Sequence, residues 1–101
     1  MSRPCARLTT IEELREYVYH TLCEHDFLQP DYFPMTERML FRKGKPCGIF
    51  FCVHGPRAVK LTAIWETERN QILFYGSTGE RFMVVQLAES PALQEPAVHA
   101  A

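Results

Sequence analysis

Apolar residues recur at helical spacing near the start of the chain and at strand spacing after it. The helical stripe consists of Ile11, Leu14, Val18 and Leu22, whose period of about 3.6 residues is typical of an amphipathic helix. Thr9 and Thr10 each precede a glutamate by three residues, the spacing of a capping box, so the helix is predicted to begin at one of them. It is predicted to end near His25 or Asp26, before the prolines that follow.

From Thr36 onward, runs of β-forming residues alternate with short turn sequences. The predicted strands are residues 36–43, 47–54, 58–67, 71–76 and 80–87. Such short connections make neighbouring strands antiparallel. The spacing from Ser77 to Glu80 also fits a helix cap, so a helix over 80–88 is an alternative, although the run 82–85 favours a strand. The chain is therefore predicted to be an α+β protein, with one N-terminal amphipathic helix packed on a curved antiparallel sheet of about five strands in meander order, or on a barrel-like version of that sheet.

Three of the predicted strands carry apolar residues on both faces, whereas the strand at 58–67 alternates and places Trp65 on its core face. One helix covers about one face, and each large apolar side chain left in water forfeits about 1.5–3 kcal/mol. The second face is therefore predicted to be covered, by curling of the sheet, by the aromatic linker 27–33, by the tail, or by a partner such as a second copy. The predicted interface residues are Phe50, Cys52, Leu73, Tyr75, Met83 and Val85.

Length and composition fit one globular domain. The chain has 101 residues, of which 47% are hydrophobic and 23% are charged, unlike a disordered sequence. Residues 1–8 have no periodic pattern and are predicted to be flexible. Residues 9–87 are predicted to form the domain, and residues 88–101 are predicted to be a disordered tail.

The charged residues are unevenly distributed, although the net charge is only −1. Residues 9–31 are mainly acidic and residues 36–60 are mainly basic. Basic residues near phenylalanines are typical of surfaces that bind single-stranded nucleic acid, although a dedicated binder is usually more basic overall. A nucleic-acid site here is an alternative that is not favoured, and it would use Arg38, Arg42, Lys43, Lys45, Arg57 and Lys60.

The four cysteines form no C-x-x-C pair, and the first ten residues lack the apolar segment of a secretory signal. We therefore expect free thiols in a reducing cytoplasm. No apolar run approaches the roughly 20 residues of a membrane span, so no membrane partner is expected. The weak candidates for a zinc site are Cys52, His54, His20 and Cys23. Their spacing lacks the close ligand pairs of zinc sites, so no metal or other cofactor is predicted.

Two short motifs have simple structural interpretations. Cys52 and His54 share one strand face and could act as nucleophile and base, but strand spacing puts their α-carbons about 6.5–7 Å apart. Gly76–Gly79 suggests a phosphate-binding loop, but it lacks the lysine of such loops and is followed by Glu80, so a hairpin turn is predicted. No catalytic residue is predicted.

The excess of apolar strand surface, without a clustered polar site, favours a non-enzymatic protein-interaction module that could bind a second copy of itself. The first alternative is binding of single-stranded nucleic acid through the basic hairpin around residues 38–60. The least favoured alternative is a small enzyme, which should have a concave pocket with perturbed side-chain pKa values.

Overall fold

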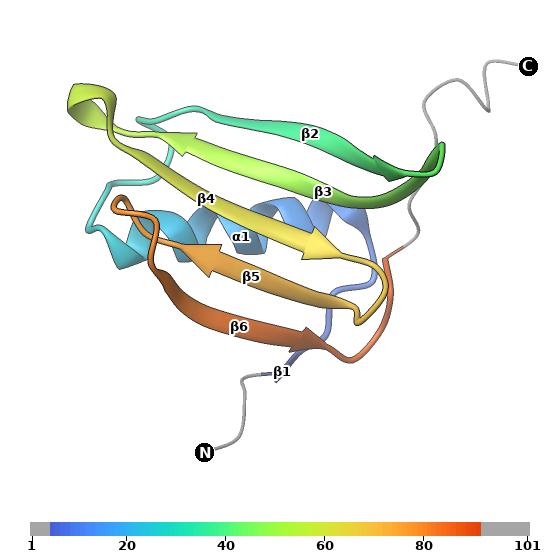
Figure 1. Cartoon of the computed structure of the whole chain (residues 1–101). Helices are drawn as coiled ribbons and strands as arrows, with labels where there is room; N and C mark the ends of the chain where they lie inside the picture. The colour runs from blue at the N-terminus through green and yellow to red at the C-terminus, as the bar shows by residue number, and fades with distance from the viewer. Residues whose placement is uncertain (1–4, 92–101) are drawn as a thin grey trace, which may run out of the picture.

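The computed structural model describes residues 5–91, which form one helix on one face of a six-stranded sheet (Figure 1). Helix α1 spans Ile11–His25. The strands are β1 (Cys5–Ala6), β2 (Met35–Arg42), β3 (Lys45–His54), β4 (Lys60–Glu66), β5 (Gln71–Tyr75) and β6 (Arg81–Leu87), and a 3₁₀ turn, η1 (Pro56–Ala58), links β3 to β4. Their order across the sheet is β1-β6-β5-β4-β3-β2.

The ends of α1 follow the predicted capping pattern. The Thr10 side chain accepts a hydrogen bond from the Glu13 amide at 3.1 Å, and Thr9 donates from its amide to the Glu13 carboxylate at 2.8 Å. The hydrogen bonds that the Glu13 carboxylate accepts from the Thr9 amide and, next, from the Thr9 hydroxyl lower the pKa of this carboxyl. The helix ends at His25 with Asp26 as its cap, as predicted. Within residues 5–91, no helix combines the length and the apolar character needed to cross a bilayer.

The predicted strand count and the simple meander order are wrong at one edge of the sheet. Strands β2 to β6 do follow one another in chain order, but β1 adds a sixth strand that lies parallel to β6, with Cys5 opposite Gln86 and Ala6 opposite Leu87. Leu8, just after β1, is 9% exposed and packs in the core. A strand of two residues has no alternation for a sequence pattern to detect. The predictions for residues 1–4 and 92–101 lie outside the described residues.

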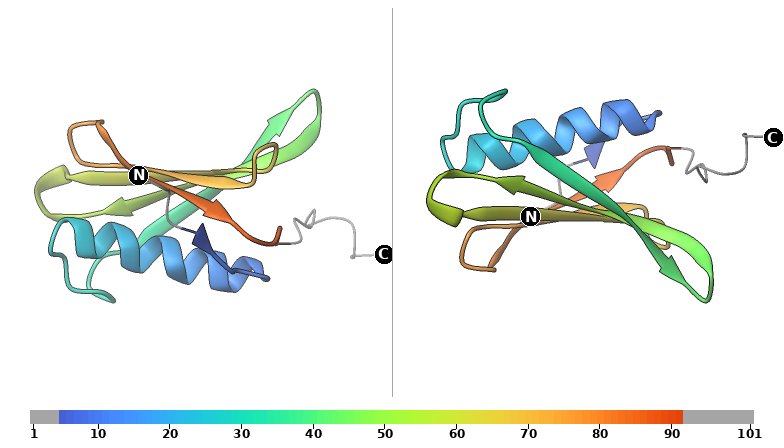
Figure 2. Two further views of the ribbon diagram at one scale, coloured as in Figure 1. Left: turned by 90° about the horizontal axis from the view of Figure 1, so that it is seen from below. Right: turned by 90° about the horizontal axis from the view of Figure 1, so that it is seen from above.

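The sheet does not close into a barrel, because β1 and β2 form its two separate edges. Figure 2 shows a twisted open sheet with α1 on one side of it. The helical alternative for residues 80–88 is also wrong. Residues 81–87 form β6, which pairs with β5 through a register shift between Phe74 and Tyr75.

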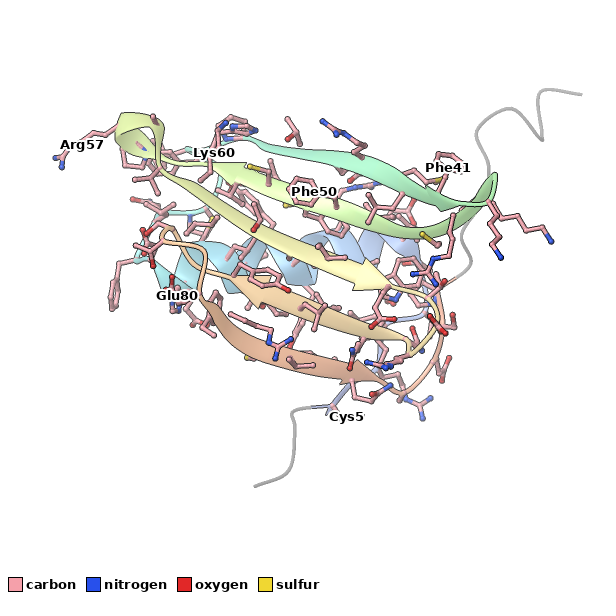
Figure 3. All side chains as sticks on the ribbon, viewed as in Figure 1. Cys5, Phe41, Phe50, Arg57, Lys60 and Glu80 are labelled. Atoms are coloured by element: carbon pink, nitrogen blue, oxygen red, sulfur yellow. The ribbon has the colours of Figure 1, made fainter. Side chains whose placement is uncertain are left out.

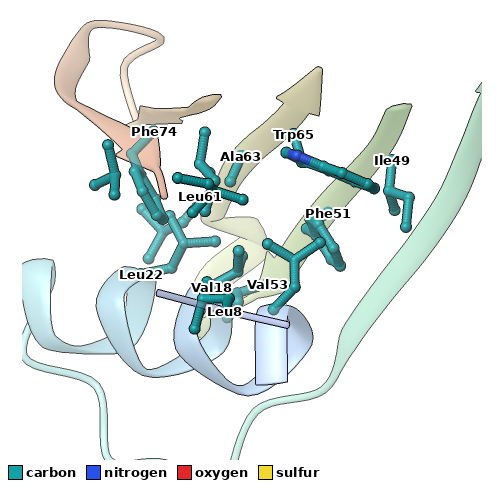
Figure 4. Close-up of a cluster of buried hydrophobic side chains, with 14 of the residues drawn as sticks. Leu8, Val18, Leu22, Ile49, Phe51, Val53, Leu61, Ala63, Trp65 and Phe74 are labelled. Atoms are coloured by element: carbon teal, nitrogen blue, oxygen red, sulfur yellow. The ribbon is translucent and has the colours of Figure 1, made fainter. Parts of the chain in front are cut away.

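The core lies between α1 and the inner face of the sheet (Figure 4). Leu14, Val18 and Leu22 from the apolar stripe of α1 are fully buried there. From the sheet come Ile49, Phe51, Val53, Leu61, Ala63, Trp65, Ile72, Phe74, Val85 and Leu87. Every second residue of each central strand therefore faces the helix, which leaves the residues between them on the other face.

Candidate functional site

The sheet face opposite α1, which we call the open face, carries a row of apolar residues that crosses four strands. Phe50 pairs with Ile64, Ile64 with Leu73, and Leu73 with Val84. We call these four residues the apolar ladder. All four are partly exposed, and none belongs to the core cluster. Direct cross-strand neighbours have side chains in mutual contact range, so the ladder forms one continuous apolar strip.

Rows of more polar residues border the ladder on both sides. The row toward the N-terminal end of β4 contains Thr36, Cys52, Thr62, Tyr75 and Arg81. The row toward the C-terminal end of β4 contains Leu40, Gly48, Glu66, Gln71 and Gln86. An apolar centre with a more polar border is the usual composition of a protein-interaction surface.

Four of the six predicted interface residues lie on the open face, namely Phe50, Cys52, Leu73 and Tyr75. Met83 and Val85 were predicted there wrongly. Val85 is fully buried opposite Ile72, and Met83 packs against the core opposite Phe74. The sequence pattern divides β6 into two sets of residues but does not say which set faces the helix.

Ile64 and Val84 are the ladder residues that the sequence pattern missed. Ile64 stands between Thr62 and Glu66 on its strand face, so alternation alone assigned that face to solvent. The apolar neighbours of Ile64 on this face belong to the adjacent strands, Phe50 on β3 and Leu73 on β5. The register of the sheet is therefore the signal that finds it.

Within the described residues, neither curling of the sheet nor the linker 27–33 covers the open face. The sheet is open, with β1 and β2 at its separate edges, and Figure 2 shows α1 on the opposite side. The linker between α1 and β2 does not cross the open face either. Its Leu28 and Phe33 pack against the core, whereas Phe27 and Tyr32 are 96% and 71% exposed.

The structure separates the four zinc candidates. Cys52 and His54 lie on the open face of β3, whereas His20 and Cys23 belong to α1 on the other side of the sheet. Cys23 is fully buried and His20 is exposed. Among the described residues, no group of three or more His, Cys, Asp or Glu side chains could hold a metal ion. The four side chains therefore cannot share one zinc ion.

Cys52 and His54 each have a hydrogen-bond partner other than one another: the Cys52 thiol donates to the Val53 carbonyl, and His54 bonds to Thr36. The Nε2 atom of His54 lies 3.0 Å from the Oγ1 atom of Thr36, on the neighbouring strand β2. Burial raises the pKa of the Cys52 thiol, which disfavours the reactive thiolate. Cys52 therefore behaves as a small apolar residue of the open face.

The six predicted nucleic-acid residues do not form one patch. Arg42, Lys43 and Lys45 lie close in sequence to the exposed Phe41 at the tip of the β2–β3 hairpin. Arg57 lies in the η1 turn, at the opposite end of the sheet (Figure 3). Lys60 begins β4 at that same end, and Arg38 lies beside Phe50. Each antiparallel strand runs from one end of the sheet to the other, so the basic residues of this segment are divided between the two ends.

The loop around Gly76–Gly79 is a hairpin turn, as predicted. The Gly76 amide donates to the Glu80 carbonyl at 2.8 Å, and the Gly79 amide donates to the Gly76 carbonyl at 3.0 Å. Gly79 has a φ of 89°, a conformation that favours glycine. The Thr78 hydroxyl donates to the Glu80 carboxylate and lowers its pKa. The amides of both glycines are thus used within the turn and are not free for a phosphate.

A hollow of about 480 Å³ lies beside α1, away from the open face. It is lined by Tyr17, His20, Thr21, Glu24, Leu28 and Pro30. Burial raises the pKa of the Tyr17 hydroxyl. These residues do not include a nucleophile paired with a base, and the small-enzyme alternative stays a prediction.

Comparison of this chain with protein-family models, with curated proteins and with solved structures finds no match. The chemistry of its own surfaces is therefore the basis for a functional proposal.

Proposed function

We propose that this chain is a non-enzymatic protein-interaction module that self-associates through its open face. The observation that carries the proposal is the apolar ladder, Phe50, Ile64, Leu73 and Val84, which lies partly exposed outside the core. Contiguous apolar patches on a soluble domain are typical of interaction sites. A second copy supplies a surface of the same shape and polarity, so it is the simplest partner.

Energetics also favour a covered ladder. Fully burying one large apolar side chain stabilises by about 1.5–3 kcal/mol, and each ladder residue would gain a part of that. The whole domain has a net stability of only about 5–15 kcal/mol, so four such residues are a substantial share.

The four cysteines are unpaired in the structure, and a reducing cytoplasm stays the expected location.

The test is self-association measured by sedimentation velocity over a range of protein concentrations. Ile64→Asp places a charge in the middle of the ladder and should weaken self-association at least tenfold, because burying an unpaired carboxylate is costly. Leu73→Lys should do the same. Phe41→Asp is the matched control, since Phe41 is 58% exposed at the hairpin tip and lies outside the ladder.

Circular dichroism shows whether each variant is folded. A wild-type chain that stays monomeric up to about 1 mM, where association is weaker than about 4 kcal/mol, would contradict self-association. Equal weakening by Phe41→Asp and Ile64→Asp would place the interface elsewhere.

A second candidate function, binding of single-stranded nucleic acid, is supported by the tip of the β2–β3 hairpin. There Phe41 is 58% exposed, and Arg42, Lys43 and Lys45 are exposed around it. An aromatic ring with flanking cations can stack on a base and contact phosphates. Such binding should weaken steeply with added salt and disappear when Arg42, Lys43 and Lys45 are changed to glutamate.

A further inference from the structure

Strand β4 carries opposite charges at the two ends of its open face. Lys60 stands at its start and Glu66 at its end, and the ladder residue Ile64 lies between them. Lys60 is exposed, and its neighbour on β3 is His54. Neither Lys60 nor Glu66 forms a salt bridge within residues 5–91. Strand β4 is thus electrically polar along its open-face residues.

The Glu66 carboxylate is held in a fixed position by its neighbours. Its Oε1 atom accepts a hydrogen bond from the Arg69 amide at 3.1 Å, and its Oε2 atom accepts one from the Gln71 side chain at 2.8 Å. Each carboxylate oxygen can accept a second hydrogen bond. Glu66 is therefore a pre-positioned acceptor that loses little side-chain freedom when a cation approaches.

Two copies can stack their open faces in three simple ways. A two-fold axis parallel to the strands places like charges together, Lys60 on the partner's Lys60 and Glu66 on the partner's Glu66. An orthogonal stack separates Lys60 from the partner's Glu66 and places Glu66 over the partner's ladder row, where the carboxylate would lose water without a cation beside it. A two-fold axis that runs across the strands level with Ala63 reverses the strand direction and places Lys60 over the partner's Glu66, because each lies three positions from Ala63. It sets the two ladders side by side, about 7 Å apart along the strands.

We infer that two copies of this chain pair in the third arrangement, with Lys60 of each copy against the partner's Glu66. The inference rests on the proposed function and adds the orientation of the two copies. The symmetry of the pair forms this contact twice, once on each side of the two ladders. The arrangement keeps the aligned packing of a β-sandwich, with the two ladders side by side at its centre.

Charge exchange tests this orientation. Lys60→Glu alone and Glu66→Lys alone should each weaken self-association roughly tenfold, because each removes two attractive contacts and adds two repulsive ones. The double variant Lys60→Glu/Glu66→Lys should recover the wild-type affinity to within about threefold, because both contacts are restored with reversed sign. The loss of self-association affinity in the single variants should become smaller with added salt, because salt screens charges near a surface.

A mixture of the two single variants gives the sharpest result. In a heterodimer of a Lys60→Glu chain with a Glu66→Lys chain, both contacts join opposite charges. The equimolar mixture should therefore associate about as tightly as the wild type, while each variant alone does not. Glu16→Lys on α1 and Lys43→Glu at the hairpin tip are matched controls that should leave self-association unchanged.

The outcomes separate this inference from the proposed function. If Ile64→Asp abolishes self-association but the single charge variants associate like the wild type, the open face is the interface and the orientation is wrong. Failure of both the double variant and the mixture to recover affinity would also overturn the orientation. A monomeric wild type would overturn both proposals together.

Discussion

Replacing Trp65 with alanine is expected to lower the free energy of unfolding by about 3–5 kcal/mol. Trp65 is the largest fully buried side chain and lies in the core among residues of β3, β4 and β5. Its Nε1 atom donates a hydrogen bond to the Oδ1 atom of Asn70 at 3.0 Å. Removing the indole leaves both a cavity and an unpaired acceptor, and each is costly.

The effect of Trp65→Ala would extend to the end of β6 through Asn70. The Asn70 side chain also donates to the carbonyl of Glu89 at 3.1 Å, and its backbone has a φ of 51°. The change in the free energy of unfolding is measured by urea denaturation followed by circular dichroism. Tryptophan fluorescence is not a suitable signal, because the chain has one tryptophan and the variant lacks it. Trp65→Phe is the control and should cost clearly less, since it keeps most of the volume. A loss below about 1 kcal/mol for Trp65→Ala would contradict the assigned core.

Replacing Gly48 with alanine is expected to destabilise the chain by about 1–3 kcal/mol, although a glycine-to-alanine change within a strand usually stabilises. A β-carbon at Gly48 would lie 2.2 Å from the carbonyl oxygen of Trp65, on the adjacent strand β4. Backbone atoms cannot move aside as a flexible side chain can, so β3 and β4 would have to separate locally.

Thermal and urea unfolding of Gly48→Ala measure this cost, and Gly55→Ala is the matched control. A β-carbon at Gly55 would meet the Leu28 side chain at 3.3 Å and the Val59 carbonyl oxygen at 3.5 Å, contacts that a small shift relieves. Gly55→Ala should therefore change stability by less than about 1 kcal/mol. If Gly48→Ala were as stable as the wild type, the close approach of β3 and β4 would be wrong.

Local rules predicted the elements of this fold well. The spacing of Thr10 and Glu13 identified the start of α1, and the structure has the corresponding hydrogen bond at 3.1 Å. The five longer strands lie within a few residues of their predicted bounds. Capping, turn chemistry and alternation depend on residues close in sequence, so one sequence is sufficient to read them.

Long-range features were harder to predict. Strand β1 forms because Cys5 and Ala6 meet the far end of β6, a contact between the two ends of the described chain. The assignment of Val85 to the open face was wrong because alternation gives two faces without saying which one meets the helix. Ile64 was missed because its apolar neighbours lie on other strands.

The candidate nucleic-acid site shows the same limit in a different way. Lys45 and Arg57 are near each other in sequence, but β3 runs the length of the sheet between them. A run of basic residues along antiparallel strands is therefore divided between opposite ends of the sheet, and sequence proximity overstates the size of the patch.

An exposed apolar ladder has a consequence for how the stability of this chain must be described. If two copies bury their ladders against each other, the native species is a complex, and its population obeys the law of mass action. Unfolding then converts one dimer into two chains, so each tenfold dilution lowers the free energy of unfolding per dimer by about 1.4 kcal/mol. A melting temperature would then belong to a stated protein concentration and not to the chain alone.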